Sequence, residues 1–180
     1  MKDIEALMDE FLDCLPCKFD RPYPEVKVEE ENPRYAKLLM DAYADGDKSE
    51  FTAIGQYLHH HFTIENKEIA NAELCISLVE MKHLHILSDL ITALGGNPKY
   101  RRSNKMWWSG GEVSYGDSAC LKLKLDIAAE QAAIEGYEVL LSEIKDKHIQ
   151  EIILRIIEDE KVHEQILTDL LDKYCRKNHG

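Results

Sequence analysis

One pattern of glutamate and histidine occurs twice in this chain and limits how the chain can fold. Each copy has a single glutamate and then, after an interval that is equal in the two copies, a Glu-x-x-His pair. The six residues are Glu50, Glu80 and His83 in the first copy and Glu130, Glu160 and His163 in the second. Residues three positions apart share one face of a helix, so each pair can offer a carboxylate and an imidazole to one site.

These residues are expected to face the interior of a helical fold. Ile54 and Leu58 share the helical face of Glu50, and the other three glutamates have similar apolar neighbours. A carboxylate buried without a partner costs several kcal/mol or takes up a proton. Two divalent cations would neutralise all four glutamates. Mixed imidazole and carboxylate ligands favour iron or manganese over zinc, calcium or magnesium, so the repeat predicts two iron or manganese ions.

Apolar residues recur at helical spacing along most of the chain, and no segment alternates like a strand. Asn32-Pro33 is a typical helix start, and Gly95-Gly96-Asn97-Pro98 is a typical helix stop. Residues 14–33, rich in proline and acids, are expected to form an extended arm. The fold class is therefore all-α, with helices predicted over residues 2–13, 33–44, 49–62, 66–94, 118–144 and 148–176.

The lengths of the links between these helices predict the topology. Short links make helices antiparallel neighbours, and such links join the third helix to the fourth and the fifth to the sixth. Residues 95–117 form a much longer connection, long enough to run the length of a bundle. We expect a four-helix bundle made of two antiparallel hairpins joined by this crossover. Residues 1–32 would form an N-terminal helix and arm, and residues 33–180 the bundle.

The charge of the chain bears on its partners. Twenty-two basic and 34 acidic residues give a net charge of −12, which would repel nucleic acid and anionic membranes. No apolar run reaches about 18 residues, so no membrane-spanning helix is expected. The acidic start of the chain is unlike a signal peptide and predicts a cytoplasmic protein. The densest basic stretch is expected to be a solvated loop and consists of Lys99, Arg101, Arg102 and Lys105.

The five cysteines are odd in number and show no disulfide framework. Cys14 and Cys17 form a C-x-x-C pair, but a tetrahedral thiolate site needs four ligands and the chain has no second such pair. We expect two reduced thiols near the end of a helix. A redox dithiol, or a metal site shared across a dimer, are the alternatives.

Over residues 33–176 the chain resembles the ferritin-like superfamily of di-iron and di-manganese carboxylate proteins, whose bundles carry this ligand pattern. The segments SEFTAIGQYLHHHF, VEMKHLHILSDLITALGG, LDIAAEQAAIEGY and IIEDEKVHEQIL are most similar to the manganese-catalase and rubrerythrin-like branch. The arm DRPYPEVKVEEENPRYAKLL is similar to the entry segment of manganese-catalase-type and spore-coat-type relatives. The resemblance implies that Glu80 and Glu130 bridge the metal ions, that Glu50 and Glu160 are terminal ligands, and that His83 and His163 bind one ion each.

The resemblance implies a redox enzyme that acts on hydrogen peroxide, of the catalase or peroxidase type, with dioxygen as the other small-molecule substrate. A peroxidase would need an external electron donor. Iron oxidation and storage, or a spore-coat-type structural role, are the alternatives. The long C-terminal extension of full-size manganese catalases, the rubredoxin domain of rubrerythrins and the short fifth helix of storage cages have no counterpart in the sequence. A homo-oligomer is expected because the N-terminal helix and arm have apolar faces.

Several acids are expected to support the ligands. Asp159, one turn before His163, would accept a ring N–H from a ligand histidine, and Asp126 would act likewise. Val79 occupies the position on its helix that Asp159 occupies, so this support should be asymmetric. Glu73 shares the face of the second helix that carries the ligands. It could be an extra ligand, a gate to the metals, or an acid at the surface or in the layer behind the ligands.

Two tyrosines and two aromatic clusters complete the candidates. Tyr57 and Tyr137 each lie seven residues after a single glutamate, where they could hydrogen-bond a ligand or a peroxide as catalytic residues, or only pack. The run His59-His60-His61 is expected to end its helix, where imidazolium favours the negative end of the dipole. Trp107 and Trp108 are expected to anchor the crossover.

Overall fold

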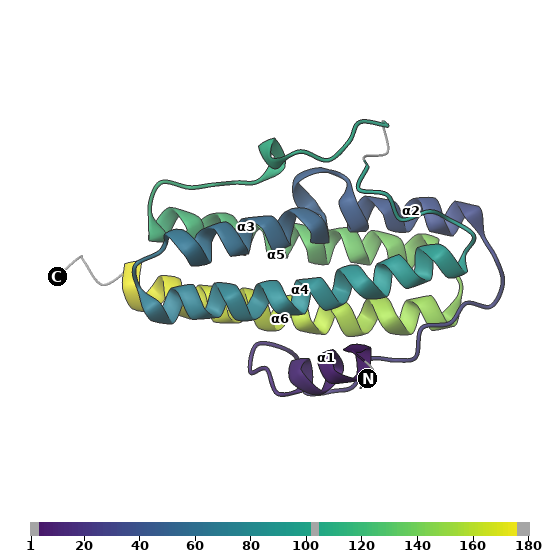
Figure 1. Ribbon diagram of the computed structural model, residues 1–180, viewed down its shortest axis with the longest axis horizontal. Helices are drawn as coiled ribbons and strands as arrows, with labels where there is room; N and C mark the ends of the chain where they lie inside the picture. Colours follow the sequence, from purple (N-terminus) through teal and green to yellow (C-terminus); the bar gives the residue numbers. More distant parts are fainter. Residues whose placement is uncertain (1–3, 102–104, 176–180) are drawn as a thin grey trace.

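The fold is built from helices, as Figure 1 shows. The computed structural model describes residues 4–101 and 105–175. Within these ranges the only β-type pairing is an isolated bridge between Arg101 and Trp107, so the all-α prediction is confirmed. The predicted limits at residues 2 and 176 lie outside the described residues, and the other limits agree to within a few positions. The helices are α1 (Ile4–Asp13), α2 (Pro33–Ala44), α3 (Glu50–Thr63), α4 (Lys67–Ala93), α5 (Ala119–Glu143) and α6 (Lys147–Cys175), with short 3-10 helices at η1 (Gly46–Lys48) and η2 (Gly110–Glu112).

Capping residues fix where the helices begin and end. The Asn32 side chain accepts hydrogen bonds from two backbone N–H groups in the first turn of α2, and Asn66 does the same for α4. After α4, Gly95 has a φ of +81°, and the N–H of Gly96 reaches the carbonyl of Ile91 at 2.8 Å. Glycine adopts this left-handed conformation without strain. These caps set the register of the helices that carry the predicted ligands.

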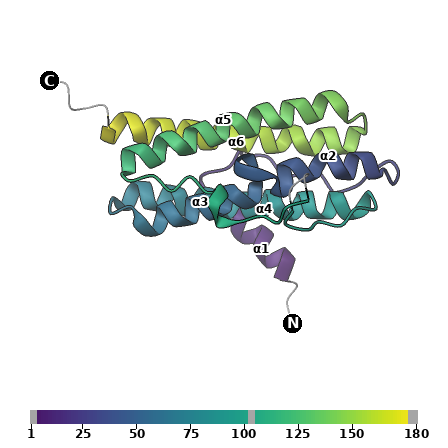
Figure 2. The ribbon, with the colours of Figure 1, turned by 90° about the horizontal axis from the view of Figure 1, so that it is seen from above.

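Two antiparallel hairpins make up the bundle, as predicted. Helix α3 packs against α4, and α5 packs against α6, each pair being joined by a short link. The described parts of the connection from α4 to α5, residues 94–101 and 105–118, run along the outside of the bundle (Figure 1). Helix α2 continues the layer of α3, separated from it by η1, and packs mainly against α4 (Figures 1 and 2). None of the described helices is both long and apolar enough to cross a bilayer.

One of the two tryptophans anchors the crossover. Trp108 Nε1 donates to Thr52 Oγ1 at 2.8 Å, and its ring packs edge-on against Phe51 with the ring centroids 4.7 Å apart. Trp107 is 66% exposed, so the anchoring role predicted for it is wrong. In the basic stretch, Lys99 and Lys105 are exposed, Arg101 is half-buried, and Arg102 lies outside the described residues.

The apolar core consists of two clusters with a polar layer between them. The cluster at the end where α2 packs includes Leu87 and Ile153, and the cluster toward the other end includes Ile76 and Leu167. Along both α4 and α6, the residues change from one cluster to the other across the Glu-x-x-His pair. Burial of apolar surface stabilises each cluster by about 25 cal/mol per Å². The two clusters thus hold the helices together on both sides of the polar layer.

The N-terminal segment lies against the outside of the bundle. Helix α1 exposes Ile4, Leu7 and Phe11, and in Figure 2 it projects away from the bundle. The chain then runs as an arm without regular structure to the start of α2 at Pro33, in agreement with the predicted extended segment.

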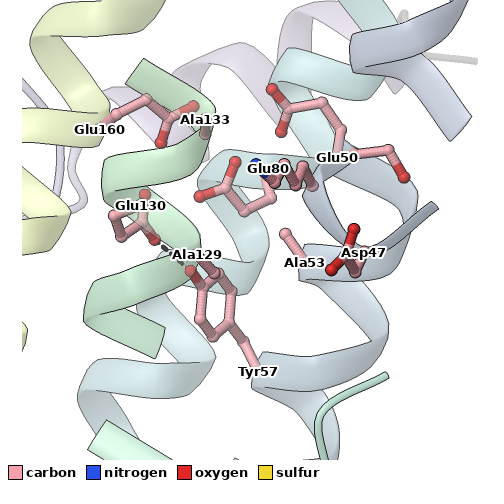
Figure 3. A pocket seen from close by; sticks show the side chains of 11 residues that line it. Asp47, Glu50, Ala53, Tyr57, Glu80, Ala129, Glu130, Ala133 and Glu160 are labelled. Atoms are coloured by element: carbon pink, nitrogen blue, oxygen red, sulfur yellow. Dashed lines mark hydrogen bonds between the residues drawn. The ribbon is translucent and has the colours of Figure 1, made fainter. Parts of the chain in front are cut away.

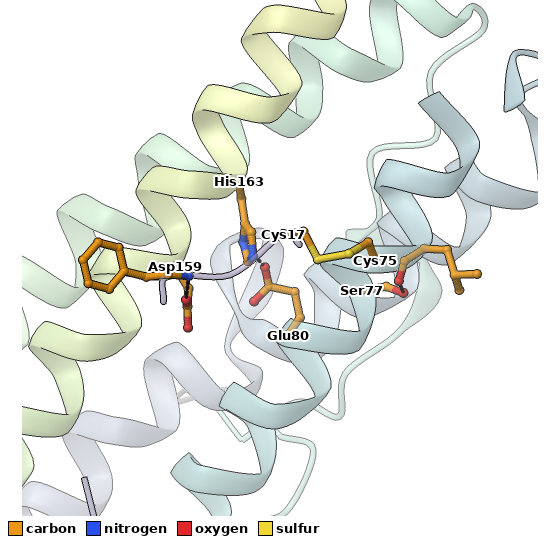
Figure 4. The surroundings of a disulfide bond; sticks show 8 residues. Cys17, Cys75, Ser77, Glu80, Asp159 and His163 are labelled. Carbon is orange, nitrogen blue, oxygen red and sulfur yellow. Dashed lines mark hydrogen bonds and ion pairs between the residues drawn. A yellow bond between two sulfur atoms is a disulfide. The ribbon is translucent and has the colours of Figure 1, made fainter. Parts of the chain in front are cut away.

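The cysteines pair in a way that the sequence analysis did not anticipate. Cys17 is bonded to Cys75 of α4, and Cys120 is bonded to Cys175, whereas Cys14 is an exposed free thiol. The expectation of two reduced thiols is therefore wrong for Cys17, and Cys14 and Cys17 do not form a dithiol. The bonded cysteines are 58 and 55 positions apart in the sequence, and only the folded chain brings them together. The first bond ties the arm to α4 (Figure 4).

Candidate metal centre

The six residues of the repeated pattern lie together in the polar layer between the two apolar clusters. Four different helices supply them, and all six side chains are buried. Figure 3 shows the four glutamates converging from α3, α4, α5 and α6. They are Glu50 on α3, Glu80 and His83 on α4, Glu130 on α5, and Glu160 and His163 on α6.

The first group of ligand atoms surrounds His83. The Nδ1 atom of His83 lies 2.9 Å from a carboxylate oxygen of Glu80 and 3.3 Å from one of Glu160. Glu50 is 3.6 Å away from the same nitrogen. One candidate ligand atom from each of these four residues lies within 4.8 Å of all the others, which is close enough for one metal ion.

The second group surrounds His163 and repeats this geometry. The Nδ1 atom of His163 lies 2.9 Å from Glu80 and 3.1 Å from Glu160. Glu130 is 3.6 Å away from it. These four residues also have ligand atoms within 4.8 Å of one another. Glu80 and Glu160 therefore belong to both groups, as carboxylates between two ions would.

This arrangement differs from the roles that the family resemblance implied. Glu80 and Glu160 are the shared carboxylates, whereas Glu130 belongs to one group alone. The reason is geometric, because the two Glu-x-x-His pairs lie on α4 and α6 and face each other across the bundle. The single glutamates on α3 and α5 flank this central pair from opposite sides. Glu160, and not Glu130, is therefore the second carboxylate that would lie between two ions.

Burial is the largest influence on the carboxyl groups of Glu50, Glu80 and Glu130 and by itself raises their pKa values. The pKa values of Glu50 and Glu130 lie well above the ordinary value, because burial and the charges of the shared glutamates act together. Burial also raises the pKa of Glu80, but the two neighbouring histidines outweigh it and hold that pKa well below the ordinary value. Burial lowers the histidine pKa values, and the surrounding anionic groups outweigh it and raise them. The cluster thus needs bound cations or protons.

The residues present fit a pair of metal ions. One oxygen of Glu80 and one of Glu160 are buried and have no hydrogen-bond partner. Carboxylate oxygens and imidazole nitrogens together form a ligand set that suits iron and manganese. Four carboxylates also balance the charge of two divalent cations, so a pair of ions would leave the buried layer neutral.

Two buried tyrosines link the single glutamates across the two hairpins. The Tyr57 hydroxyl donates to Glu130, as Figure 3 shows, and the Tyr137 hydroxyl donates to Glu50. Burial, reinforced by the neighbouring carboxylates, raises the pKa of both tyrosines well above the ordinary value. Both hydroxyls therefore stay protonated at neutral pH and hold the carboxylates as hydrogen-bond donors. The sequence left three roles open for Tyr57 and Tyr137: a hydrogen bond to a ligand, a hydrogen bond to a peroxide, or packing alone. The geometry favours the hydrogen bond to a predicted ligand.

His83 is held from its other side by a carboxylate. Its Nε2 atom lies 3.1 Å from Asp159 Oδ2. Asp159 also accepts hydrogen bonds from the backbone N–H of Phe19, at 2.6 Å, and from the Tyr23 hydroxyl. Burial raises the pKa of Asp159, but the hydrogen bonds from His83, Arg155 and Tyr23 outweigh it and lower that pKa. An ionised Asp159 fixes the orientation of the His83 ring.

Arg155 joins this carboxylate to the arm and was not among the predicted site residues. Its fully buried guanidinium forms an ion pair with Asp159 at 2.7 Å. It also donates to the carbonyls of Arg21 and Phe19, at 2.7 and 2.8 Å, and lies 4.3 Å from the ring centroid of Tyr23. A lone arginine inside the apolar run IILRII was the signal that could have revealed it.

His163 has no such support. Its Nε2 atom is buried and has no hydrogen-bond partner. Val79 occupies on α4 the position that Asp159 occupies on α6, as the sequence analysis noted. The acid on the helix of His163 therefore contacts His83 on the facing helix.

Asp126 and Glu73 lie next to the centre and do not contact its histidines. Asp126 accepts a hydrogen bond from Gln56 at 2.7 Å and lies 2.8 Å from Nδ1 of His60. Glu73 is buried beside this pair, so it is not a surface acid and lies in the layer behind the ligands, which was the other half of that alternative. His60 is fully buried, which the sequence analysis missed. The signal was its spacing, three residues after Tyr57 on an inward face.

A small cavity of about 20 Å³ opens beside the glutamates. It has room for roughly one molecule the size of water. Tyr57 and all four glutamates of the centre line it, as Figure 3 shows. Asp47 and Lys48 also line it and are exposed. The cavity thus lies beside the glutamates on the side where η1 joins α3.

The chain belongs to the ferritin-like family, since the family model of that description matches residues 45–134, half of the chain. Among curated proteins, it is 29% identical to a probable manganese catalase from Clostridium acetobutylicum, over 87% of this chain and 77% of that protein. It is also 29% identical to a bacterioferritin from Desulfovibrio desulfuricans, over 63% of each chain. Among solved structures, the manganese catalase KatB from Anabaena superposes with a TM-score of 0.81 at 25% identity, covering 89% of this chain and 81% of KatB.

Proposed function

We propose that this protein is a di-metal oxidoreductase that disproportionates hydrogen peroxide, with two manganese ions as the preferred metal and two iron ions as the alternative. One observation carries the proposal: two ligand groups, each with one histidine, share Glu80 and Glu160 in a buried layer. The similarity to proteins named manganese catalases supports peroxide as the substrate. The proposed ligands are Glu50, Glu80, His83, Glu130, Glu160 and His163.

A pair of manganese or iron ions would supply the two electrons that peroxide exchanges, since one peroxide is reduced to water and another is oxidised to dioxygen. The protein residues would hold the ions and manage the surroundings. Tyr57 and Tyr137 would keep Glu130 and Glu50 in place through their hydroxyl hydrogen bonds. Asp159 would hold the N–H of His83 and so orient its Nδ1 toward the metal site.

The shape of the site favours a very small substrate. The cavity beside the glutamates has a volume of about 20 Å³, which suits peroxide or dioxygen and excludes larger organic molecules. Asp47 and Lys48 also line the cavity, are exposed, and would be the first side chains that an entering molecule meets. Catalase-type turnover needs no second binding site for an organic electron donor.

Oxygen evolution from peroxide tests this proposal. Purified protein loaded with manganese should release one dioxygen for every two peroxides consumed, with no added reductant. The Glu80→Gln variant should lose this activity, whereas Glu135→Gln, an exposed charge change on α5, should retain it. Peroxide consumption that requires a reductant would indicate a peroxidase instead, with an external electron donor as an additional partner.

Similarity to bacterioferritin favours iron oxidation and storage as the second candidate function. A storage protein would assemble into a large shell and take up many irons per chain. Sedimentation and iron analysis after aerobic addition of Fe²⁺ would distinguish it from a catalase, which should retain only a few ions per chain.

We also propose that the protein forms a homo-oligomer in the cytoplasm. Ile4, Leu7 and Phe11 on α1 offer an exposed apolar face, and sedimentation equilibrium would measure the assembly. Disulfide bonds are rare in the reducing cytoplasm, so the location needs its own test. Cell fractionation combined with thiol labelling should recover the protein in the cytoplasmic fraction.

A further inference from the structure

A second buried polar cluster lies beside the di-metal centre, toward the end of the bundle where α3 joins α4. His60, Glu73 and Asp126 form it, one each from α3, α4 and α5, and all three are fully buried. A nitrogen of His60 and an oxygen of each carboxylate lie within 4.8 Å of one another. None of the three belongs to the six proposed ligands of the metal pair.

The hydrogen bonds of His60 fix which of its nitrogens faces the cluster. Its Nε2 atom lies 2.9 Å from the carbonyl oxygen of Ser114 and 3.0 Å from that of Tyr115. Since carbonyl oxygens only accept, Nε2 must carry a hydrogen. A neutral His60 then presents the lone pair of Nδ1 to Asp126 Oδ2, 2.8 Å away. Two acceptors at this distance require a cation or a proton between them.

Asp126 is also held in place by hydrogen bonds. Its Oδ1 atom accepts a hydrogen bond from Gln56 Nε2 at 2.7 Å. Gln56 is fixed in turn, because its Oε1 atom accepts from the backbone N–H of Ser114 at 3.0 Å. Ser114 thus supports both Asp126 and His60. Such outer contacts typically orient metal ligands.

Glu73 provides the observation that points to a ligand. Both of its carboxylate oxygens are buried and have no hydrogen-bond partner. Its neighbour Asp126 is a second acceptor, and burial together with that charge raises the pKa of Glu73. The charge of Lys122 offsets this rise in the pKa of Glu73 only in part. The Nζ atom of Lys122 donates a hydrogen bond to Thr63 Oγ1 at 2.6 Å. The two carboxylates and the free lone pair of His60 therefore face one another as acceptors, and the charge of Lys122 offsets them only in part.

We propose that His60, Glu73 and Asp126 form a third, mononuclear site for a divalent first-row transition-metal cation such as Zn²⁺ or Mn²⁺. Two carboxylates neutralise the charge of one divalent cation, and the imidazole nitrogen disfavours calcium and magnesium. Three protein ligands leave at least one coordination position for water. Glu73 lies two helical turns before Glu80, so the third ion would sit within about 10 Å of the pair along the bundle.

The third ion would tie the crossover to the bundle, which the metal pair does not do, and it would add a second link among three of the helices that the pair also joins. It would connect α3, α4 and α5 at one end of the bundle and, through the Nε2 hydrogen bonds of His60, hold the end of the crossover at Ser114 and Tyr115. Loading this site should therefore raise the melting temperature even when the di-metal centre cannot bind. The proposal does not depend on the peroxide activity.

Anomalous diffraction from crystals of the full chain soaked with Zn²⁺ tests the proposal directly. Data collected on both sides of the zinc absorption edge should show a peak between His60 Nδ1, Glu73 and Asp126, separate from any peaks at the di-metal centre. Elemental analysis after dialysis should give one ion fewer per chain for Glu73→Gln than for the unmodified protein. The exposed variant Glu138→Gln should lose none.

Two results would overturn the proposal. The first is an unmodified protein with no anomalous peak at the cluster, and the second is a Glu73→Gln variant with an unchanged ion count. A proton shared between Glu73 and Asp126 would produce both results, because the cluster would then hold no cation. In the Glu73→Gln variant the glutamine amide would donate to Asp126 in place of that proton. If Glu73→Gln does not fold, the diffraction experiment on the unmodified chain still decides. A chain without peroxide activity but with the third peak would contradict only the proposed function.

Discussion

The two histidines of the candidate metal centre have matching environments on one side of the ring and different ones on the other. Through Nδ1, each faces Glu80, Glu160 and one single glutamate at nearly the same distances. Through Nε2, His83 contacts Asp159, whereas His163 has no hydrogen-bond partner. The repeated sequence pattern is thus symmetric in its ligands and asymmetric in what supports them.

The difference arises from Asp159 on α6 and from the N-terminal arm that helps to hold it. Asp159 is held by Arg155 and by Phe19 and Tyr23 of the N-terminal arm, and nothing equivalent reaches His163. A carboxylate on the far nitrogen of a histidine fixes the ring and makes it a better ligand. We therefore expect the half of the centre around His83 to bind its ion more tightly. The arm would act as part of the metal site, although it supplies no ligand.

The largest expected effect is a difference in metal content between variants of a shared glutamate and of a single glutamate. Glu80→Gln should lose both ions of the centre, because Glu80 belongs to both ligand groups, whereas Glu50→Gln should lose at most one. Elemental analysis relative to the unmodified chain measures the difference. Equal losses in the two variants would contradict the shared role of Glu80.

The next effect compares matching positions on the two facing helices. Asp159→Asn should weaken binding of one ion by about 10- to 100-fold, because it removes the charge that holds His83. Val79→Ala, at the equivalent position on α4, should leave affinity unchanged and cost roughly 1–2 kcal/mol of stability through lost packing. Competition with a chelator of known affinity measures binding. If Asp159→Asn and the unmodified protein have similar metal affinities, Asp159 does not strengthen metal binding by His83.

The two disulfide bonds provide a matched pair of changes. Their loops are similar in length, so Cys17→Ala/Cys75→Ala and Cys120→Ala/Cys175→Ala should each lose about 2–4 kcal/mol of unfolding free energy in urea. Only the first bond ties the arm to α4. The first double variant alone should therefore also bind metal a few-fold more weakly. An equal loss of affinity in both would mean that the arm contributes no more than general stability.

The smallest effect concerns a single hydroxyl of the arm. Tyr23→Phe keeps the ring against Arg155 and removes the hydrogen bond to Asp159, so stability should fall by about 1–2 kcal/mol. Tyr115→Phe, whose exposed hydroxyl donates to Gly110, is the control and should change stability little. Thermal unfolding of both variants measures the difference. If Tyr23→Phe loses no more stability than the control, the Tyr23 hydroxyl does not support Asp159.

The sequence predicted most of the helical architecture, because caps and glycine stops act locally. The helix start predicted at Asn32 and the helix stop predicted at Gly95 are both confirmed. The hydrogen bonds that cap each helix join residues within one or two turns of each other. The repeat also identified the residues that gather in the polar layer, because inward spacing on a helix is visible in sequence. Which of them are shared could not be read in this way, since it depends on α4 facing α6.

Contacts between distant segments were the main omissions. The bond between Cys17 and Cys75, and the chain of contacts from Tyr23 through Arg155, require the arm to lie against the bundle. His60 does lie in the last turn of α3, as predicted, but its burial was not anticipated. Its partner Asp126 lies 66 positions away. Spacing within one helix carries no information about such pairings.

Crystals of the protein loaded with manganese, measured at the manganese absorption edge, would show whether the buried glutamates of the polar layer bind two metal ions. We expect two anomalous peaks about 3.5–4 Å apart, both lying between Glu80 and Glu160. One peak should lie beside His83 and the other beside His163. If there is no peak between those glutamates, and the melting temperature of the protein does not change when manganese or iron is added, the polar layer does not bind a metal pair.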